Sequence, residues 1–341
     1  MRILIIGRYD TSYSRNAILM RGLQLQNIQF DECRVQPGRA WSLSRLVWQF
    51  LQHRAPYDVI LVLFPGQEVV PWLRFCTRKP ILFDAFTSHY EGYIQDRKIA
   101  PVVSVRSLWY RFIDWLSCRL ADRVLVDTNA HAKYFSDTYR VPASKMETIY
   151  LGSMLSEREW PPIQPTERII HFHGSNIPLQ GIGVIFDAIR LLKSSGLQFQ
   201  MVGPFAIPAD LSGVVTHYPR VAFKELAQLM ERSRVCLGIF GSTLKAQRVI
   251  PNKVYEAIAC RRPVITGDTP AMRELFNEDS IRFVPLGSAR ALASAIEQLV
   301  SDTVRANEQA TAAYARLLDR ATPDIVGKQL RTICDQLSLR A

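Results

Sequence analysis

The sequence has 341 residues, enough for two domains of ordinary size. Hydrophobic residues make up 48% and charged residues 21%, a balance typical of globular proteins, so a disordered or low-complexity chain is excluded. The net charge of +11 is spread over both halves, without a basic tail or a block of Lys and Arg. This distribution weakens a nucleic-acid-binding interpretation and favours small anionic molecules or an anionic lipid surface as partners.

The chain begins with a short apolar run, Met1 to Gly7, and then turns polar. A signal peptide would continue through a longer apolar stretch, and a membrane-spanning helix needs about 20 apolar residues. The run is therefore predicted to be a first buried strand. The six cysteines form no C-x-x-C pair, which predicts reduced cysteines in a cytoplasmic protein rather than disulfides or a zinc site.

Short apolar runs alternate with longer amphipathic stretches through residues 1–155. The run Val59 to Leu63 is apolar at every position, as expected of a parallel strand buried on both faces. Such alternation predicts right-handed βαβ units and a doubly wound sheet. The expected strands are 2–7, 29–33, 58–64, 80–85, 122–127 and 146–150, and the expected helices are 15–26, 42–54, 67–76, 105–120 and 129–138.

Polar residues and prolines between Glu157 and Glu167 predict a linker, after which the alternation restarts and predicts a second α/β domain. Ligands bind beyond the carboxyl ends of the strands in open α/β sheets, so two such domains are expected to share one cleft. The expected strands are 168–173, 198–202, 234–239, 262–266 and 281–284. The expected helices are 181–195, 223–232, 252–260, 270–277 and 288–300, followed by 304–338 with a break at Thr322-Pro323.

The most informative stretch runs from Leu237 to Glu274. A predicted strand is followed by a loop that carries Lys245 and Arg248. A helix then begins, with Lys253 in its first turn and Glu256 on the same face. A helix N-terminus offers unpaired N–H groups and the positive end of the helix dipole. Three cations at such an end, with a carboxylate one turn further along for a ribose, predict a site for a nucleoside diphosphate.

A turn later in this stretch contains Gly267, Asp268 and Thr269, just before a helix that begins at Pro270. Backbone N–H groups of this turn are expected to add to the anion site. Each of these residues alone would be an ordinary surface residue. Their joint order, from strand and loop to helix, strand and turn, favours a binding site.

The pattern P-N-K-x-x-E-A-x-A-C-x-x-P-V-I, followed by G-D-T-P-A, resembles the nucleotide-binding motif of GT-B glycosyltransferases of the family 4 type. The segments Leu120 to Thr128 and Ile149 to Gly152 resemble the end of that family's acceptor domain, and Ile169 to Ile182 resembles the start of its donor domain. The resemblance covers essentially the whole chain. It implies two facing Rossmann-like domains: an acceptor-binding domain over 1–155 and a nucleotide-sugar-binding domain over 165–321. A C-terminal helix over about 322–341 would cross back to the first domain.

The resemblance implies transfer of a sugar from a nucleotide-diphosphate sugar to an acceptor, such as a lipid-linked or cell-surface glycan precursor, with retention of configuration. Glu256 would bind the ribose, while Lys253 and Arg248 would neutralise the leaving diphosphate as catalytic residues. No metal or other cofactor is expected. The donor-binding residues would be Gly174, Ser175, Lys245, Arg248, Lys253, Glu256, Gly267, Asp268 and Thr269.

Three features depart from the family pattern. Arg248 stands where many members carry the first glutamate of an E-x7-E pair, and Ser175 and Gln180 stand where many carry Arg and Lys. The phosphate charge is therefore expected to come from the cations near the helix N-terminus. Arg261 follows Cys260 at a position that often needs a positive φ and usually holds glycine.

These departures motivate an alternative, a catalytically inactive GT-B scaffold or partner subunit that binds a nucleotide sugar. A GT-B epimerase or phosphorylase is a further alternative, less favoured because a phosphorylase would be much longer.

On the acceptor side, Asp84 lies in the predicted strand 80–85. Its carboxylate is expected to contact a sugar as a catalytic residue, or else to cap the next segment. Tyr13, Arg15 and Asn16 lie in or near the loop after the first strand, and His89 lies in a later loop. These four are the predicted acceptor-binding residues, with a helix start and an ordinary loop as the alternatives.

Two further patterns bear on partners. His171 and His173 alternate on a strand, but no further ligands follow at a suitable spacing, so a metal site is not favoured. Basic amphipathic helices with tryptophan can lie on anionic membranes, which predicts a cytoplasmic protein on the inner face of the membrane. The alternative is core tryptophan with solvated arginine. The residues concerned are Trp41, Trp48, Trp109, Trp115, Arg39, Arg45, Arg106, Arg111 and Arg119.

Overall fold

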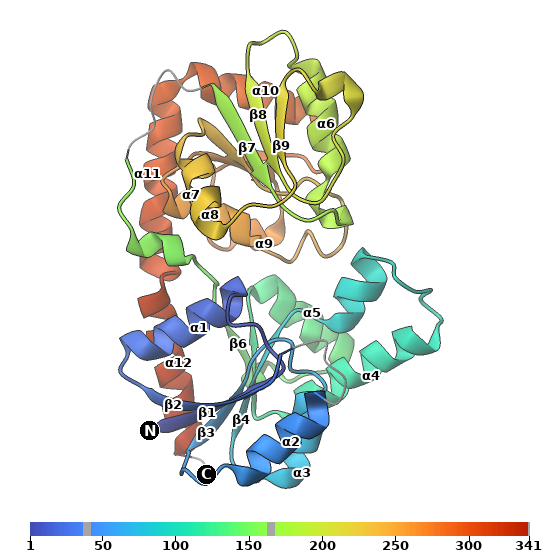
Figure 1. The fold of residues 1–341 in the computed structure, drawn as a ribbon, viewed down its shortest axis with the longest axis vertical. Coiled ribbons are helices and arrows are strands. Elements are labelled where there is room, and N and C mark those ends of the chain that lie inside the picture. The colour runs from blue at the N-terminus through green and yellow to red at the C-terminus, as the bar shows by residue number, and fades with distance from the viewer. Residues whose placement is uncertain (37–41, 162–167, 340–341) are drawn as a thin grey trace. The chain divides into compact units, whose positions relative to one another are not determined.

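The chain divides into two compact units, shown as a computed structural model in Figure 1. The structure describes residues 1–36, 42–161 and 168–339, so Arg39, Trp41 and most of the predicted linker lie outside the described residues. Unit 1 comprises Met1–Leu151 and Ala321–Ala341, and unit 2 comprises Gly152–Arg320.

Unit 1 contains a six-stranded parallel sheet in the order β2-β1-β3-β4-β5-β6. Strand β1 pairs with β2 on one side and β3 on the other, so the winding direction reverses there, as in doubly wound sheets. The central strands are apolar at consecutive positions and fully buried. The strands are β1 (Arg2–Gly7), β2 (Gln29–Arg34), β3 (Val59–Val62), β4 (Ile81–Phe86), β5 (Arg123–Val126) and β6 (Met146–Thr148).

The helices of unit 1 include one from the far end of the sequence. Helix α12 packs against α1, and Figure 1 shows the red end of the chain beside the blue end. Gly22 and Gly327 allow this contact, because a Cβ atom at Gly22 would lie 2.8 Å from the Gly327 nitrogen. The helices are α1 (Ser14–Leu25), α2 (Ser42–Gln52), α3 (Val69–Cys76), η1 (Tyr90–Asp96), α4 (Val105–Leu120), α5 (Asn129–Tyr139), η2 (Ala143–Lys145) and α12 (Pro323–Ser338).

Unit 2 contains a second six-stranded parallel sheet, in the order β12-β11-β10-β7-β8-β9. Its strands are β7 (Ile169–His173), β8 (Gln198–Val202), β9 (Val215–Tyr218), β10 (Val235–Leu237), β11 (Val264–Gly267) and β12 (Arg282–Val284). Its helices are η3 (Met154–Glu157), η4 (Pro178–Gln180), α6 (Ile182–Leu191), η5 (Ala209–Leu211), α7 (Phe223–Glu231), α8 (Asn252–Ala259), α9 (Pro270–Arg273), α10 (Ala289–Ser301) and α11 (Thr303–Arg320).

The prediction of two doubly wound α/β sheets is confirmed. Strand β9, the π-helix η1 and the short 3-10 helices η2 to η5 were not predicted. Strand β9 lies at a sheet edge and has no apolar run, and η1 is a π-helix in a segment predicted as a loop. The expected break at Thr322-Pro323 is confirmed, because the Thr322 side chain accepts a hydrogen bond from the Ile325 N–H and caps α12.

Candidate functional site

The motif residues Lys253 and Glu256 lie on α8, in unit 2. The helix begins after Pro251, and no side chain of a described residue caps its N-terminus. Lys245 and Arg248, both half-buried, lie in the preceding loop between β10 and α8, where the Arg248 N–H donates to the Lys245 carbonyl at 2.9 Å. The two basic residues thus lie in the loop that leads into α8, and their role at the start of this helix stays a prediction.

The Lys253 side chain is almost fully buried. Its Nζ lies 3.7 Å from the centroid of the Phe172 ring and donates to Gln180 Oε1 at 2.5 Å. Burial lowers the pKa of Lys253 well below its usual range, and the charge of Glu256 only partly opposes this shift. Among the described residues, no carboxylate lies within ion-pair distance of this amine. An anionic ligand would supply the negative charge that this buried lysine lacks.

Glu256 is held by a chain of two histidines. His173 Nε2 lies 2.9 Å from Glu256 Oε2, and His171 Nε2 lies 3.0 Å from His173 Nδ1. Burial, assisted by the nearby His173 and Lys253, lowers the pKa of His171 well below its usual range, so this imidazole is neutral. The chain connects β7 to α8 and orients the Glu256 carboxylate. The H-x-H spacing was the available signal, because residues i and i+2 of a strand share one face.

Among the described residues, no group of three or more His, Cys, Asp or Glu side chains is arranged to hold a metal ion. The two histidines of β7 instead contact each other and Glu256.

Glycines bring the loops of this region close together. Gly181 has a φ of +66°, and a Cβ atom there would lie 2.5 Å from the Gly241 nitrogen. A Cβ atom at Gly174 would lie 2.6 Å from Lys253 Nζ. Gly174 therefore contacts the buried amine, while Ser175, the next residue, is exposed. Of these two predicted donor-binding residues, Gly174 lies next to Lys253, and donor binding by Ser175 stays a prediction.

The turn after β11 differs from the prediction. Gly267 is the last residue of β11, and its N–H donates to the Ile239 carbonyl at 2.8 Å. The Asp268 N–H donates to the Val284 carbonyl at 2.8 Å. The expectation that these two N–H groups are available to a ligand was wrong, because neighbouring segments of the sheet already accept from them.

The side chains of this turn also have partners. Asp268 forms an exposed ion pair with Arg273, with contacts of 2.7 and 2.9 Å, and the hydrogen bonds from Arg273 lower the pKa of Asp268. The Thr269 hydroxyl accepts a hydrogen bond from the Met272 N–H and caps α9. Both side chains stabilise the turn itself. Donor binding by Asp268 and Thr269 stays a prediction.

Arg261 has the predicted left-handed conformation, with a φ of +55°. A non-glycine residue in this region is strained. Its guanidinium carbon lies 4.5 Å from the centroid of the Tyr314 ring of α11, and this contact offsets part of the strain.

In unit 1, two residues predicted to contact the acceptor side pair with each other. Arg15 Nη2 lies 2.6 Å from Asp84 Oδ1, and both side chains are fully buried. Burial raises the pKa of Asp84, and Arg15 acts against that rise. Arg15 also donates to the Ile149 carbonyl at 3.2 Å. The pair thus ties α1 to β4 and to the segment after β6, and neither side chain reaches the surface. Catalysis by Asp84 and acceptor binding by Arg15 stay predictions.

The other predicted acceptor-binding residues divide into two kinds. Asn16 is buried and donates to the carbonyls of Asp10 and Phe64, which is a structural role. Tyr13 and His89 are partly exposed and flank Phe64, with ring centroids 5.8 and 6.5 Å from it. Burial raises the pKa of Tyr13 to about 12, so its hydroxyl stays protonated at neutral pH. No motif in the sequence around Phe64 indicated that Tyr13 and His89 meet at this residue.

A second buried network in unit 1 was not predicted. His131 of α5 lies 2.5 Å from Asp127 Oδ1 and 2.9 Å from Glu91 Oε2. Burial alone would lower the pKa of His131, but the two carboxylates raise it to about 9, so the imidazole is cationic at neutral pH. Glu91 and His131 lie 40 residues apart, and no local pattern connects them.

Comparison with known proteins places these features in a wider context. Residues 184–332 match the model of a family described as glycosyl transferase-like. No curated protein matches the sequence. The structure is similar to that of sucrose-phosphate synthase from Thermosynechococcus elongatus, with a TM-score of 0.79, 16% identity and full coverage of both chains. The fold is GT-B.

Two other solved structures support the GT-B assignment. HepE of Anabaena, in complex with UDP and glucose, has a TM-score of 0.75 and 16% identity, over 98% of this chain and 100% of that chain. A glycosyltransferase from Rickettsia africae has a TM-score of 0.68 and 12% identity, over 100% of this chain and 99% of that chain.

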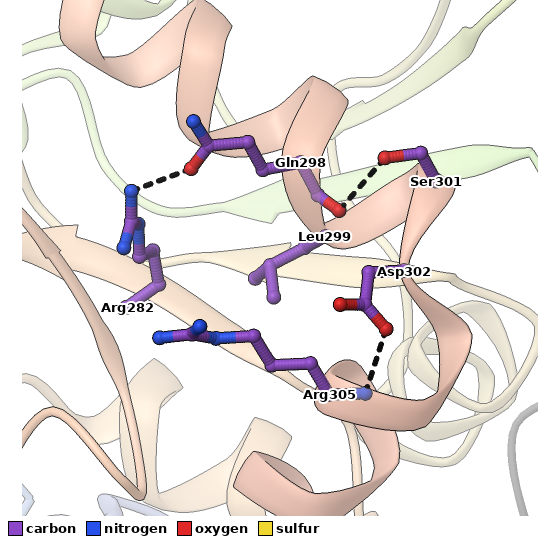
Figure 2. Close-up of a pocket in the computed structure, with 6 residues that line it drawn as sticks. All are labelled: Arg282, Gln298, Leu299, Ser301, Asp302 and Arg305. Atoms are coloured by element: carbon purple, nitrogen blue, oxygen red, sulfur yellow. Dashed lines mark hydrogen bonds between the residues drawn. The ribbon is translucent and has the colours of Figure 1, made fainter.

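A separate hollow of about 270 Å³ lies on the second unit of this GT-B chain, where β12, α10 and α11 meet (Figure 2). Its polar groups bond to one another: Gln298 accepts from Arg282, and Asp302 accepts from the backbone N–H of Arg305 at 3.0 Å. None of the motif residues around α8 lines it, so it is distinct from the predicted donor site. The lining residues are Arg282, Gln298, Leu299, Ser301, Asp302 and Arg305.

Proposed function

We propose that this protein is a glycosyltransferase that uses a nucleotide-diphosphate sugar and binds it through unit 2. The observation that carries this is Lys253, a buried amine whose partners among the described residues are an amide oxygen and an aromatic ring. A diphosphate beside Nζ would supply the missing negative charge. Two findings support this role: the glycosyl transferase-like match includes α8, and HepE was solved in complexes with UDP and with UDP-glucose.

Glu256 is the proposed ribose ligand. His173 contacts one oxygen of its carboxylate, and the other can accept a hydrogen bond from a ribose hydroxyl. The carboxylate is oriented before the donor arrives, so little side-chain entropy is lost on binding.

The reaction would break the bond between the sugar C1 and the diphosphate oxygen through an oxocarbenium-like state. The acceptor oxygen would bond to C1 on the face that the diphosphate leaves, and the hydroxyl proton would pass to the departing diphosphate. Negative charge then develops on the diphosphate, and Lys253, Arg248 and Lys245 would stabilise it electrostatically. We assign retention of configuration and a hexosyl donor, and no metal ion is needed in this scheme.

Unit 1 is the proposed acceptor-binding domain. Tyr13 and His89 are the residues best placed to contact an acceptor, because both are partly exposed beside Phe64. The buried residues Arg15, Asn16 and Asp84 would position Tyr13 and His89 from the interior of unit 1. The acceptor we propose is a lipid-linked or glycan precursor at the inner face of the membrane.

A specific observation favours a second candidate, an inactive scaffold that binds the nucleotide sugar. Gln180 stands where the resembling family carries a basic residue, and it accepts a hydrogen bond from Lys253. A donor phosphate would have to compete with this amide, and such a site could bind nucleotide without turnover.

Calorimetric titration of the full chain with UDP, GDP, dTDP and ADP tests the donor site. Lys253→Ala should weaken binding of the preferred nucleotide by about 1.5–3 kcal/mol, because it removes a charge-assisted contact. Lys224→Ala, at an exposed position on α7, is the matched control and should bind as the unaltered protein does. Equal affinity in both variants would contradict the donor site, whereas tight binding without sugar transfer to lipid-linked acceptors would favour the scaffold.

A further inference from the structure

Helix α4 and the segment before it expose a row of large apolar side chains on unit 1. Val103, Val105, Leu108, Trp109, Phe112 and Trp115, here called the α4 ridge, are between 41% and 89% exposed. The rings of Trp109 and Phe112 lie 6.1 Å apart, and those of Phe112 and Trp115 lie 5.9 Å apart. In Figure 1 the segment before α4 and the helix itself, drawn in teal, extend away from the sheet of unit 1.

The ridge is not the face by which α4 packs on its own unit. At about 3.6 residues per turn, the helical ridge residues fall on one face of α4. Ser107, Ser117 and Cys118 fall on the opposite side of the helix and are buried. The ridge is therefore an unpartnered second apolar face, larger than the scattered apolar residues of ordinary protein surfaces.

The exposed charges of residues 97–121, the segment that contains the ridge, are all of one sign. Between residues 97 and 121 the one acidic residue, Asp114, is fully buried. The five basic residues of this segment, which are Arg97, Lys98, Arg106, Arg111 and Arg119, are all exposed. On the helix, Arg106 and Arg111 fall on the two flanks of the ridge. Apolar and aromatic side chains bordered by cations match the boundary between acyl chains and anionic headgroups.

We propose that the α4 ridge docks on an anionic lipid bilayer. The apolar side chains would enter the headgroup boundary, and the flanking arginines would pair with lipid phosphates. Among the described residues no helix has the length and apolar character needed to cross a membrane, so the docking would be interfacial. Its use in presenting a lipid-linked acceptor rests on the proposed function, whereas the docking itself does not.

Helix α2 contributes less than the sequence predicts. Trp48 and Leu51 are exposed there, but Leu46 and Phe50 are part of the core of unit 1. Trp48 is exposed but lies outside the α4 ridge, and it serves as a matched control.

Flotation of the full chain with vesicles, without donor or acceptor, tests the docking. The protein should float with vesicles of phosphatidylcholine mixed with phosphatidylglycerol, and not with phosphatidylcholine alone. Binding should fall at least tenfold at high salt, because the Debye length shrinks to about 3 Å at 1 M. Each cation near an anionic surface contributes roughly fivefold to binding. The double variant R106E/R111E should therefore lose well over tenfold, and W109S/F112S a similar factor.

The controls W48S and K224E should bind as the unaltered protein does. All these positions are exposed, and circular dichroism verifies that each variant is folded. Failure to float with phosphatidylglycerol vesicles at low salt would overturn the docking, as would an equal loss in W48S. Self-association in sedimentation that W109S/F112S abolishes, without vesicle binding, would assign the ridge to a second copy instead. A chain that floats but binds no nucleotide would overturn the proposed function and leave the docking intact.

Discussion

His173 Nε2 and Glu256 Oε2 lie 2.9 Å apart, although 83 residues separate them in the sequence. The contact joins the end of β7 to the second turn of α8. His171 forms a hydrogen bond with the other ring nitrogen of His173. The carboxylate proposed to hold the ribose is therefore positioned from the sheet and not by its own helix.

Replacing His173 tests this positioning. His173→Phe keeps a ring but removes the hydrogen bond, and should weaken UDP binding by about 1–3 kcal/mol. His173→Gln keeps a donor and should recover part of the loss. The measurement is calorimetric titration with UDP and with 2′-deoxy-UDP. The loss should shrink for the deoxy compound, and an equal loss with both nucleotides would contradict a role through the ribose.

Nucleotide binding should take up a proton at pH values between the pKa of Lys253 in the free protein and its pKa in the complex. Burial lowers the pKa of Lys253, and a bound diphosphate would raise it again by favouring the charged amine. Between the two pKa values the free protein is neutral at this position and the complex is charged, so affinity falls as pH rises through this window. Calorimetry in buffers of different ionisation enthalpy measures the uptake. Lys253→Ala should abolish it, and undiminished uptake in that variant would refute the assignment.

Transfer should need no added divalent metal, because Lys253, Arg248 and Lys245 are proposed to stabilise the leaving diphosphate. The rate of nucleotide release with a lipid-linked acceptor should be unchanged by EDTA. Loss of activity that Mg²⁺ or Mn²⁺ restores would contradict the prediction.

His131 should make the stability of unit 1 depend on pH. Its pKa is raised from 6.5 to about 9, despite burial, by Asp127 and Glu91. A base whose pKa is raised on folding contributes its full stability below the unfolded pKa and loses it as pH rises through the folded pKa. The free energy of unfolding should therefore fall between pH 6.5 and about 9, by on the order of 3 kcal/mol.

Urea unfolding at a series of pH values measures this dependence. His131→Gln should flatten the curve in this window, while Lys133→Gln, at an exposed position on the same helix, should leave it unchanged. If the free energy of unfolding of His131→Gln falls with pH as steeply as that of the unaltered protein, groups other than His131 cause the pH dependence.

The contact between α1 and α12 should tolerate no side chain at its centre. A Cβ atom at Gly327 would lie 2.2 Å from the Gly22 carbonyl oxygen, so Gly327→Ala should destabilise the protein by about 1–3 kcal/mol through overpacking. Gly183→Ala, where a Cβ atom would meet nothing within 4 Å, is the control. Thermal unfolding measures both, and equal midpoints would contradict the close contact.

Local patterns predicted the two sheets and the position of α8, because burial on both faces and helix starts are properties of neighbouring residues. They failed where pairing depends on distant segments. Arg15 and Asp84 each had the character of a ligand-binding residue, and their mutual ion pair depends on how α1 packs against β4. The Gly267 N–H had the character of an available donor, and its acceptor is the Ile239 carbonyl in a segment much earlier in the chain.

Unit 1 is discontinuous in sequence, whereas unit 2 is one continuous segment. During synthesis the residues of unit 2 are all present before those of α12, and domains generally fold as units when their residues become available. Until α12 has been made, the face of α1 that carries Gly22 lacks its partner. A nascent chain would therefore hold a complete second unit beside an incomplete first one. Most residues of unit 1 are translated before those of unit 2. Unit 1 is nevertheless the unit to which chaperones that recognise exposed apolar surface would bind, because it stays incomplete until α12 has been made.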